Sequence, residues 1–206
     1  MSTAALWLVT SYFVGAIPTS YLAGRLFRGI DLREHGSKNL GATNVYRMLG
    51  WKYAIPVGLV DIAKGAVPVL VFAPQASGSQ LFALACGVAA IVGHVFSVFV
   101  RFRGGKGVAT AAGVMLGLAP LALGVALVIW LVVLKLSGYV SLASIAAAAG
   151  FPLAVYLLDR PDQPGILWLD ALVAAAIIWL HRANIRRLLN GTESRFGRRA
   201  VPPAHP

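Results

Sequence analysis

Charged side chains are scarce in this 206-residue chain, and acidic ones are the scarcest. Only 12% of the residues are charged and only 7 are Asp or Glu, whereas 58% are hydrophobic. In a soluble domain about a quarter of the residues are charged. The mean hydropathy of this chain is +0.77. The composition excludes an ordinary soluble protein and predicts an all-α integral membrane protein with several spans.

Cysteine and the usual metal motifs are also missing. The single cysteine, Cys86, lies in an apolar run. One cysteine excludes a disulfide framework, a CxxC motif and a thiolate metal cluster. There is no HExxH motif, no paired His/Cys spacing and no cluster among the five Asp residues, so we expect neither a metal nor a cofactor.

Positive charge is in excess, with 18 Lys and Arg residues and a formal net charge of +11. In a soluble protein this excess would suggest a nucleic-acid partner. Here the basic residues fall between long apolar stretches. Membrane topology explains them better, and we expect no nucleic-acid partner.

Six apolar runs have a length suited to crossing a bilayer core. They cover residues 4–24, 53–73, 80–100, 108–134, 139–158 and 165–181. No Lys or Arg precedes the first run, whereas Arg25 and Arg28 follow it directly. The first run is therefore not a cleavable signal, and it is expected to place the N-terminus outside.

The basic residues gather in three of the segments outside these runs. Residues 25–52, 101–107 and the tail from 182 hold 15 of the 18 Lys and Arg residues. The linkers 74–79 and 159–164 hold only one. By the positive-inside rule the three basic segments face the cytoplasm and the two linkers face outward.

Six crossings would leave the basic tail outside, so one more crossing is needed. The run 108–134 can supply it, because Ala119-Pro120 divides it near the middle. We expect two short helices of about 11 to 14 residues there, seven transmembrane helices in all and a cytoplasmic C-terminus. Residues 1–193 then form one membrane domain, and 194–206 a basic, Pro-rich cytoplasmic tail that is expected to be disordered.

Segment 35–47 concentrates hydrogen-bond donors on a flexible backbone. It holds two glycines, one Lys, Arg47 and four small polar side chains: Ser37, Asn39, Thr43 and Asn44. Such a loop suits an anion, and these five side chains are candidate substrate ligands. The alternative is an ordinary positive-inside loop with Ser or Asn helix caps.

Segment 101–110 surrounds Lys106 with three glycines and leads into a helix. Backbone N–H groups around Gly105 and Gly107 and the Lys106 ammonium can converge on a phosphate at that helix N-terminus. A nucleotide P-loop is excluded, since Val100 stands where its first Gly belongs and Gly107 replaces its Ser or Thr. The alternative is a plain glycine turn between two helices.

The last polar segment, 181–193, begins at the cytoplasmic end of the final run. His181 and Asn184 are spaced i, i+3 and share one helix face, whereas Arg182 and Arg186 share another. The first face can look into a site while the second meets anionic headgroups. For His181 alone, a helix-end cap is the competing interpretation.

Two ionisable residues lie inside the second apolar run. Asp61 and Lys64 are spaced i, i+3 and can pair, either to brace the site or as a purely structural ion pair. His94, in the third run, is interpreted as a packing residue.

Together these segments resemble one family, the bacterial membrane acyl-phosphate glycerol-3-phosphate acyltransferases of the PlsY type. The matching stretches are 36–47, 93–94, 102–110 and 181–193, with further similarity at 61–65 and 140–145, and they extend from about residue 10 to 193. Two positions depart from the family's pattern: Lys38 stands where Gly is usual, and Ser97 where Pro is frequent. We expect Lys38 to alter loop flexibility and add a phosphate contact, and Ser97 to change only a helix kink.

The resemblance implies a reaction and a location. The family passes an acyl group from acyl phosphate to the 1-hydroxyl of sn-glycerol 3-phosphate, giving lysophosphatidic acid and inorganic phosphate, the first step of phospholipid synthesis. It implies a seven-helix protein of the inner membrane, surrounded by lipid, with its site on the cytoplasmic face. It implies no cofactor and no obligatory protein partner.

On this basis the candidate residues receive roles as hypotheses. One group is expected to hold one phosphate: Ser37, Arg47, Gly105 and Gly107. A second group is expected to gather the other phosphate and orient the hydroxyl: Lys106, His181 and Asn184, as the catalytic set, with Ser144. The hydroxyl proton passes to His181 or, as we favour, to a phosphate oxygen of the substrate.

Two other functions fit the sequence less well. A small transporter for a phosphorylated solute predicts inverted repeats and charges along a transmembrane path, and the chain has no such repeat. A CDP-alcohol phosphotransferase needs clustered Asp residues for its metals.

Overall fold

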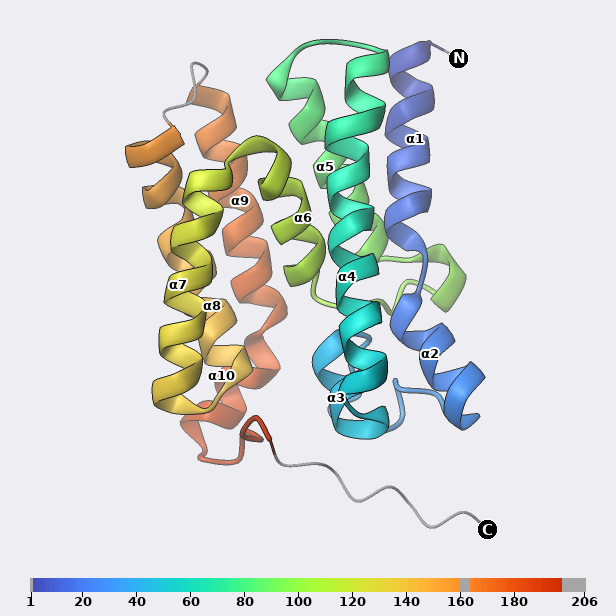
Figure 1. Cartoon of the computed structure of the whole chain (residues 1–206), viewed down its shortest axis with the longest axis vertical. Coiled ribbons are helices and arrows are strands. Elements are labelled where there is room, and N and C mark those ends of the chain that lie inside the picture. Colours follow the sequence, from blue (N-terminus) through green and yellow to red (C-terminus); the bar gives the residue numbers. More distant parts are fainter. Residues whose placement is uncertain (1, 160–163, 198–206) are drawn as a thin grey trace.

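The computed structural model describes residues 2–159 and 164–197 and contains no strand in those ranges (Figure 1). The apolar helices are α1 (Thr3–Ala16), α4 (Trp51–Val67), α5 (Gln80–Val95), α6 (Val108–Leu118), α7 (Pro120–Ser137), α8 (Val140–Ala154) and α9 (Pro164–Leu180). The shorter, more polar helices are α2 (Thr19–Arg28), α3 (Ala42–Leu49) and α10 (Arg182–Leu189). Short 3-10 or π turns cover Pro68–Phe72, Ala73–Gln75, Val98–Val100 and Val155–Asp159.

Five helical stretches are long and apolar enough to cross a membrane: Thr3–Arg28, Trp51–Gln75, Gln80–Val100, Pro120–Ser137 and Val140–Asp159. A sixth candidate is the pair Gly165–Leu180 and Arg182–Leu189, which is bent by 53°. Helix α6 rises only about 16 Å at 1.5 Å per residue, too little to span a bilayer core alone. The all-helical membrane class is confirmed, while seven crossings and their orientation stay a prediction.

The break expected inside 108–134 is present, but only one of its halves is short. Helix α6 ends at Leu118, Ala119 leaves the helical conformation at φ −147° and ψ 65°, and α7 begins at Pro120. Helix α7 then runs for 18 residues to Ser137, so the prediction of two helices of 11 to 14 residues was wrong for the second. Gly124 does not interrupt it, because a glycine is tolerated within a helix whose other residues favour one.

The first apolar run, in contrast, contains a break that the sequence reading missed. Helix α1 ends at Ala16 and α2 begins at Thr19, because Pro18 lacks an N–H group and forces Ile17 out of the helical region, to ψ 115°. The carbonyl oxygens of Ala16 and Ile17 are left without helical partners. Ser97 Oγ donates to the first at 2.5 Å, and Lys64 Nζ to the second at 3.0 Å.

These two bonds settle points that the sequence left open. Lys64 pairs with Asp61 at 2.7 Å, and Asp61 also accepts a hydrogen bond from the Thr19 hydroxyl at 2.6 Å. The buried ion pair therefore braces the break between α1 and α2. Ser97 was expected to change only a helix kink. Its hydroxyl also ties the end of α5 to the end of α1.

Glycines allow close helix contacts that position the polar loops. A β-carbon on Gly15 of α1 would overlap the backbone of Ala90 in α5, and one on Gly65 of α4 would overlap the backbone of Thr110 in α6. Small residues of this kind let helices approach closely in lipid. Helix α6 is thus held against α4, and α3 and α10 lie at the same end of the bundle (Figure 1).

The domain boundary expected at residue 193 stays a prediction, and the residues just after it contact the helices. The N–H group of Phe196 donates to the carbonyl of Gly138 at 2.7 Å, and its ring stacks on Tyr46 with centroids 5.0 Å apart. Phe196 therefore anchors the segment just after residue 193 to the helical bundle. The rest of the predicted tail, 198–206, lies outside the described residues.

Candidate active site

Three polar segments that are far apart in the sequence meet at one end of the bundle. Lys106, just before α6, donates a hydrogen bond to Oδ1 of Asn184 in α10. The Asn184 amide donates in turn to Glu193 at 2.9 Å, and Glu193 pairs with Arg187 at 2.7 Å. Arg47 of α3 reaches the same segment by donating to the carbonyl of Ser194 at 3.3 Å. The structure thus brings Lys106, Asn184 and Arg47 into one cluster.

The glycine-rich loop offers its N–H groups unequally. The amides of Gly104 and Gly105 donate to the carbonyls of Val95 and His94, at 3.0 and 3.2 Å. Gly107 adopts a left-handed φ of 76° at the N-terminus of α6, and its amide makes no hydrogen bond to any described residue. The Gly105 amide therefore holds the loop in place, whereas the N–H group of Gly107, a buried residue, is not used by the loop and remains a candidate donor to an anion.

The cluster carries more positive than negative charge, and its charged groups are partly buried. Burial and the nearby charges of Arg187 and Arg47, opposed by Glu193, together lower the pKa of Lys106 to about 8. Burial also lowers the pKa of Arg47. Burial alone would raise the pKa of Glu193, but hydrogen bonds from Asn184, Arg187 and Ser141 lower it overall. A single carboxylate therefore faces three cations, which favours an anionic ligand.

His181 lies at the junction of α9 and α10 and is 3% exposed. Its Nδ1 is 2.8 Å from the carbonyl oxygen of Ile177, a contact that requires a proton on Nδ1. In the neutral ring Nε2 is then an acceptor. This tautomer suits a residue that receives a hydroxyl proton or a hydrogen bond from one.

The two serines of α8 take different partners. Ser144 donates to the carbonyl of Val140 at 2.9 Å and accepts from Nε1 of Trp130 at 3.2 Å. Ser141, one turn earlier, donates to Glu193 at 3.1 Å. Ser144 therefore makes no hydrogen bond to Lys106, His181 or Asn184 in the described structure, and its role as a ligand stays a prediction.

Asn44 shapes the loop between α2 and α3. Its Oδ1 accepts from the N–H group of Ser37 at 2.8 Å, and its Nδ2 donates to the carbonyls of Leu32 and His35 at 3.0 and 3.1 Å. The side chain is 1% exposed. Every polar atom of the amide is thus engaged in folding the loop, which leaves its contact with substrate untested.

The other candidate side chains of this loop are not engaged in hydrogen bonds that hold the loop. Ser37, Asn39 and Thr43 are partly exposed, and their side chains make no hydrogen bond with the described residues. Lys38, where the family pattern has Gly, adopts a left-handed φ of 57°. That conformation is unfavourable for a residue with a β-carbon, which gives a physical reason for glycine at this position.

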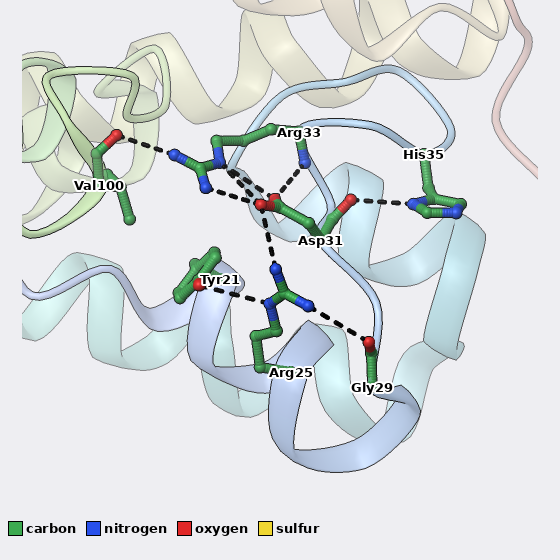
Figure 2. A network of polar contacts seen from close by, with 7 residues as sticks. All are labelled: Tyr21, Arg25, Gly29, Asp31, Arg33, His35 and Val100. Atoms are coloured by element: carbon green, nitrogen blue, oxygen red, sulfur yellow. Dashed lines mark hydrogen bonds and ion pairs between the residues drawn. The ribbon is translucent and has the colours of Figure 1, made fainter.

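A second buried network fastens the base of the same loop, and the sequence reading did not foresee it. Asp31, 4% exposed, receives three hydrogen bonds from the Arg33 side chain, the shortest at 2.6 Å (Figure 2). Arg33 also donates to the carbonyl of Val100 at 2.9 Å, and Arg25 lies 3.6 Å from the carboxylate. The loop is thereby tied to the segment that precedes Lys106.

Three residues of the cluster were not among the sequence candidates: Ser141, Arg187 and Glu193. A signal existed for Arg187, which is spaced i, i+3 from Asn184 and shares its helix face. Glu193 is the only carboxylate after Asp170 in a strongly basic stretch. A lone acid among arginines is a candidate partner for them, and this signal was available.

Comparison with known proteins gives consistent results. The pattern of the family described as glycerol-3-phosphate acyltransferase matches residues 5–191. The chain is 43% identical over 226 residues to a protein of Chlorobaculum parvum named glycerol-3-phosphate acyltransferase, covering 94% of this chain and 97% of the other. It is 46% identical over 196 residues to a protein of the same name from Trichlorobacter lovleyi, covering 95% and 99%.

Two solved structures are similar as well. Both are crystal structures of PlsY (YgiH), an integral membrane glycerol 3-phosphate acyltransferase. The glycerol 3-phosphate form has a TM-score of 0.88 at 39% identity, and the lysophosphatidic acid form 0.85 at 38%. Each covers 95% of this chain and 96% of the solved chain.

Proposed function

The chain belongs to the glycerol-3-phosphate acyltransferase family, and we propose that it transfers an acyl group from an acyl phosphate to the 1-hydroxyl of sn-glycerol 3-phosphate. The products are lysophosphatidic acid and inorganic phosphate. Relatives whose structures hold glycerol 3-phosphate and lysophosphatidic acid support the acceptor and the product. The acyl phosphate donor is proposed from the resemblance to the PlsY type.

The observation that carries the proposal is the contact of Lys106 with Asn184, beside Arg47 and Arg187. Both proposed substrates bear phosphate groups, and both must be held at once. A cluster with one carboxylate and three cations can attract them, and the Gly107 amide at the N-terminus of α6, which has no partner among the described residues, adds a directed donor.

The chemistry left to the protein is orientation and charge stabilisation. The acceptor oxygen attacks the carbonyl carbon, and the bond from that carbon to the phosphate oxygen breaks with the electron pair going to phosphate. Phosphate leaves without needing a proton, so no acyl-enzyme intermediate is required. Placing two reactants correctly is worth up to about 7–11 kcal/mol, and Lys106 is suited to stabilise the oxyanion.

The proton of the attacking hydroxyl has two possible acceptors. One is Nε2 of His181, which the Ile177 contact leaves unprotonated in the neutral ring. The other is an oxygen of the acyl phosphate itself. We propose the phosphate oxygen, because no carboxylate hydrogen-bonds to His181 among the described residues to strengthen it as a base, and His181 then orients the hydroxyl.

We also propose seven crossings with the N-terminus outside, which places the cluster on the cytoplasmic face of the inner membrane. The five long stretches and the bent pair supply six, and the short helix α6 supplies the seventh across a locally thinned bilayer. The three basic segments then share one side, as the positive-inside rule requires.

The test is phosphate release from palmitoyl phosphate by the purified protein in lipid, with and without glycerol 3-phosphate and without acyl-CoA. We expect release that depends on glycerol 3-phosphate and falls by about 10³-fold in Lys106→Ala. Lys52→Ala is the matched control, since Lys52 is exposed and has no hydrogen bond or ion pair with the described residues. A silent wild-type protein that still binds glycerol 3-phosphate would point to transport instead.

A further inference from the structure

The glycine-rich loop rests on the end of α5, and His94 provides much of that support. The carbonyl of His94 accepts the Gly105 N–H group at 3.2 Å. The His94 ring lies against the same residue, because a β-carbon built on Gly105 would overlap its Nε2. One residue thus supports the loop that carries Lys106 through both its backbone and its ring.

The other edge of the His94 ring faces the break between α1 and α2. Its Nδ1 lies 3.7 Å from Oδ1 of Asp61, the carboxylate that holds Lys64 and Thr19. A small cavity between the break and the loop is lined from both sides, by Ile17, Pro18, Thr19, His94, Gly104 and Gly105. The ring therefore reaches from the ion pair to the loop.

Packing alone does not account for a histidine at this position. His94 is 8% exposed, and its Nδ1 has no hydrogen-bond partner in the described part of the chain. An unpaired buried polar atom costs free energy. Phenylalanine would fill similar space without that cost, so the presence of a ring with a polar edge toward Asp61 calls for a reason beyond shape.

We propose that His94 is a positioning residue, which couples the Asp61–Lys64 pair to the glycine-rich loop and so sets the direction of the Lys106 side chain. Asp61, held by Thr19, faces one edge of the ring at 3.7 Å, and Gly105 rests on the other. Lys106 follows Gly105 directly, so a tilt of the ring moves the ammonium relative to Asn184. The kinetic consequence rests on the function proposed above, whereas the consequence for the loop does not.

The experiment compares three variants in lipid nanodiscs. His94→Phe keeps the volume and removes the polar edge, and His94→Gln restores a polar group. The control is Leu84→Ala in the same helix, three turns away, where the side chain is 0% exposed and its loss leaves a cavity. Amide hydrogen exchange of residues 103–108, thermal stability, and the KM and kcat for both substrates are measured.

In His94→Phe we expect amide exchange in the loop to rise by about tenfold and the KM of at least one phosphate substrate to rise by about tenfold. His94→Gln should recover part of both losses. Leu84→Ala should lower the thermal stability at least as much, yet leave loop exchange and KM unchanged. If His94→Phe behaves like Leu84→Ala, His94 only packs and the proposal is overturned.

A milder variant guards against loss of folding. Thr19→Val removes the hydroxyl that anchors Asp61 without touching the loop, and we expect a smaller rise in exchange at residues 103–108. Unchanged exchange there would contradict the proposal. An inactive wild-type protein would refute the acyltransferase function, while the exchange measurements would still decide the role of His94.

Discussion

Two buried carboxylates, Asp31 and Glu193, sit in networks that look alike and do different things. Each is nearly inaccessible and each receives hydrogen bonds from an arginine. At Asp31 two cations lie at ion-pair distance from the carboxylate, Arg33 at 2.6 Å and Arg25 at 3.6 Å. Arg25 is half exposed, so that water solvates its charge. The Asp31 network satisfies its own charges and holds a loop.

Around Glu193 the cations are not matched in this way. Among the described residues only Arg187 pairs with the carboxylate, while Lys106 donates to the amide oxygen of Asn184 and Arg47 to the carbonyl of Ser194. Both of these cations are partly buried and end on neutral oxygens. Unmatched charge away from water is costly unless a ligand compensates it. Both networks contain a buried carboxylate, so its presence does not identify a binding site. What distinguishes the site from the structural brace is that two of its cations have no carboxylate partner.

Neutralising Glu193 should have the largest effect on this contrast. Glu193→Gln removes the charge that anchors Arg187 and that raises the pKa of Lys106. We expect kcat/KM to fall by about 10²-fold at neutral pH, because Arg187 loses its anchor and a smaller fraction of Lys106 is protonated. Steady-state kinetics in lipid would measure this loss.

The pH dependence of kcat/KM in the same variant tests whether Glu193 acts on the pKa of Lys106. The pKa of Lys106 is about 8, so its charged form is present below that pH and is lost as the pH rises through it. The wild-type kcat/KM should therefore decline above about pH 8, and the decline should begin at lower pH in Glu193→Gln. A decline at the same pH in both proteins would show that Glu193 does not act on Lys106.

Neutralising Asp31 should affect stability instead of chemistry. In Asp31→Asn, Arg33 loses its charged partner, and we expect the free energy of unfolding to fall by about 2 kcal/mol with kcat/KM changed by less than about threefold. Hydrogen bonds from Arg33, together with its charge, lower the pKa of Asp31 despite burial. Their contribution is present above the unfolded pKa of about 4 and is lost as the pH falls through the folded value.

Thermal unfolding in lipid at several pH values would check this. The gap between wild type and Asp31→Asn should be full at pH 7 and shrink in acid. A large loss of turnover at unchanged stability would mean that the Asp31 network belongs to the site.

The sequence predicted the parts of this arrangement that depend on local pattern. The break at Ala119-Pro120 and the pairing of Asp61 with Lys64 follow from proline chemistry and from helix spacing, and both are present. The break at Pro18 was equally readable by proline chemistry, yet the apolar run continues on both sides and masked it.

What local pattern does not contain is the pairing of distant residues. Glu193 meets Ser141 and Asn184 only because α8 and α10 pack at one end of the bundle. Tertiary placement also decides that the Gly105 N–H group donates to the carbonyl of His94, and that the Asn44 side-chain amide bonds to its own loop. Residue types therefore indicated the chemistry, and packing decided which atoms are available for it.

The smallest expected effect concerns Lys38, which lies in the loop between α2 and α3. Its left-handed φ of 57° is unfavourable for a residue with a β-carbon, by about 1–2 kcal/mol. Lys38→Gly removes this strain, while the greater freedom of glycine in the unfolded chain returns about 0.4–1 kcal/mol. We expect a net stabilisation of about 0.5 kcal/mol, or a rise of about 1–2 °C in Tm. Kinetics of the same variant test the phosphate contact expected from the sequence. An unchanged KM would show that Lys38 affects stability alone, and a raised KM for either substrate would show that Lys38 contributes to the site.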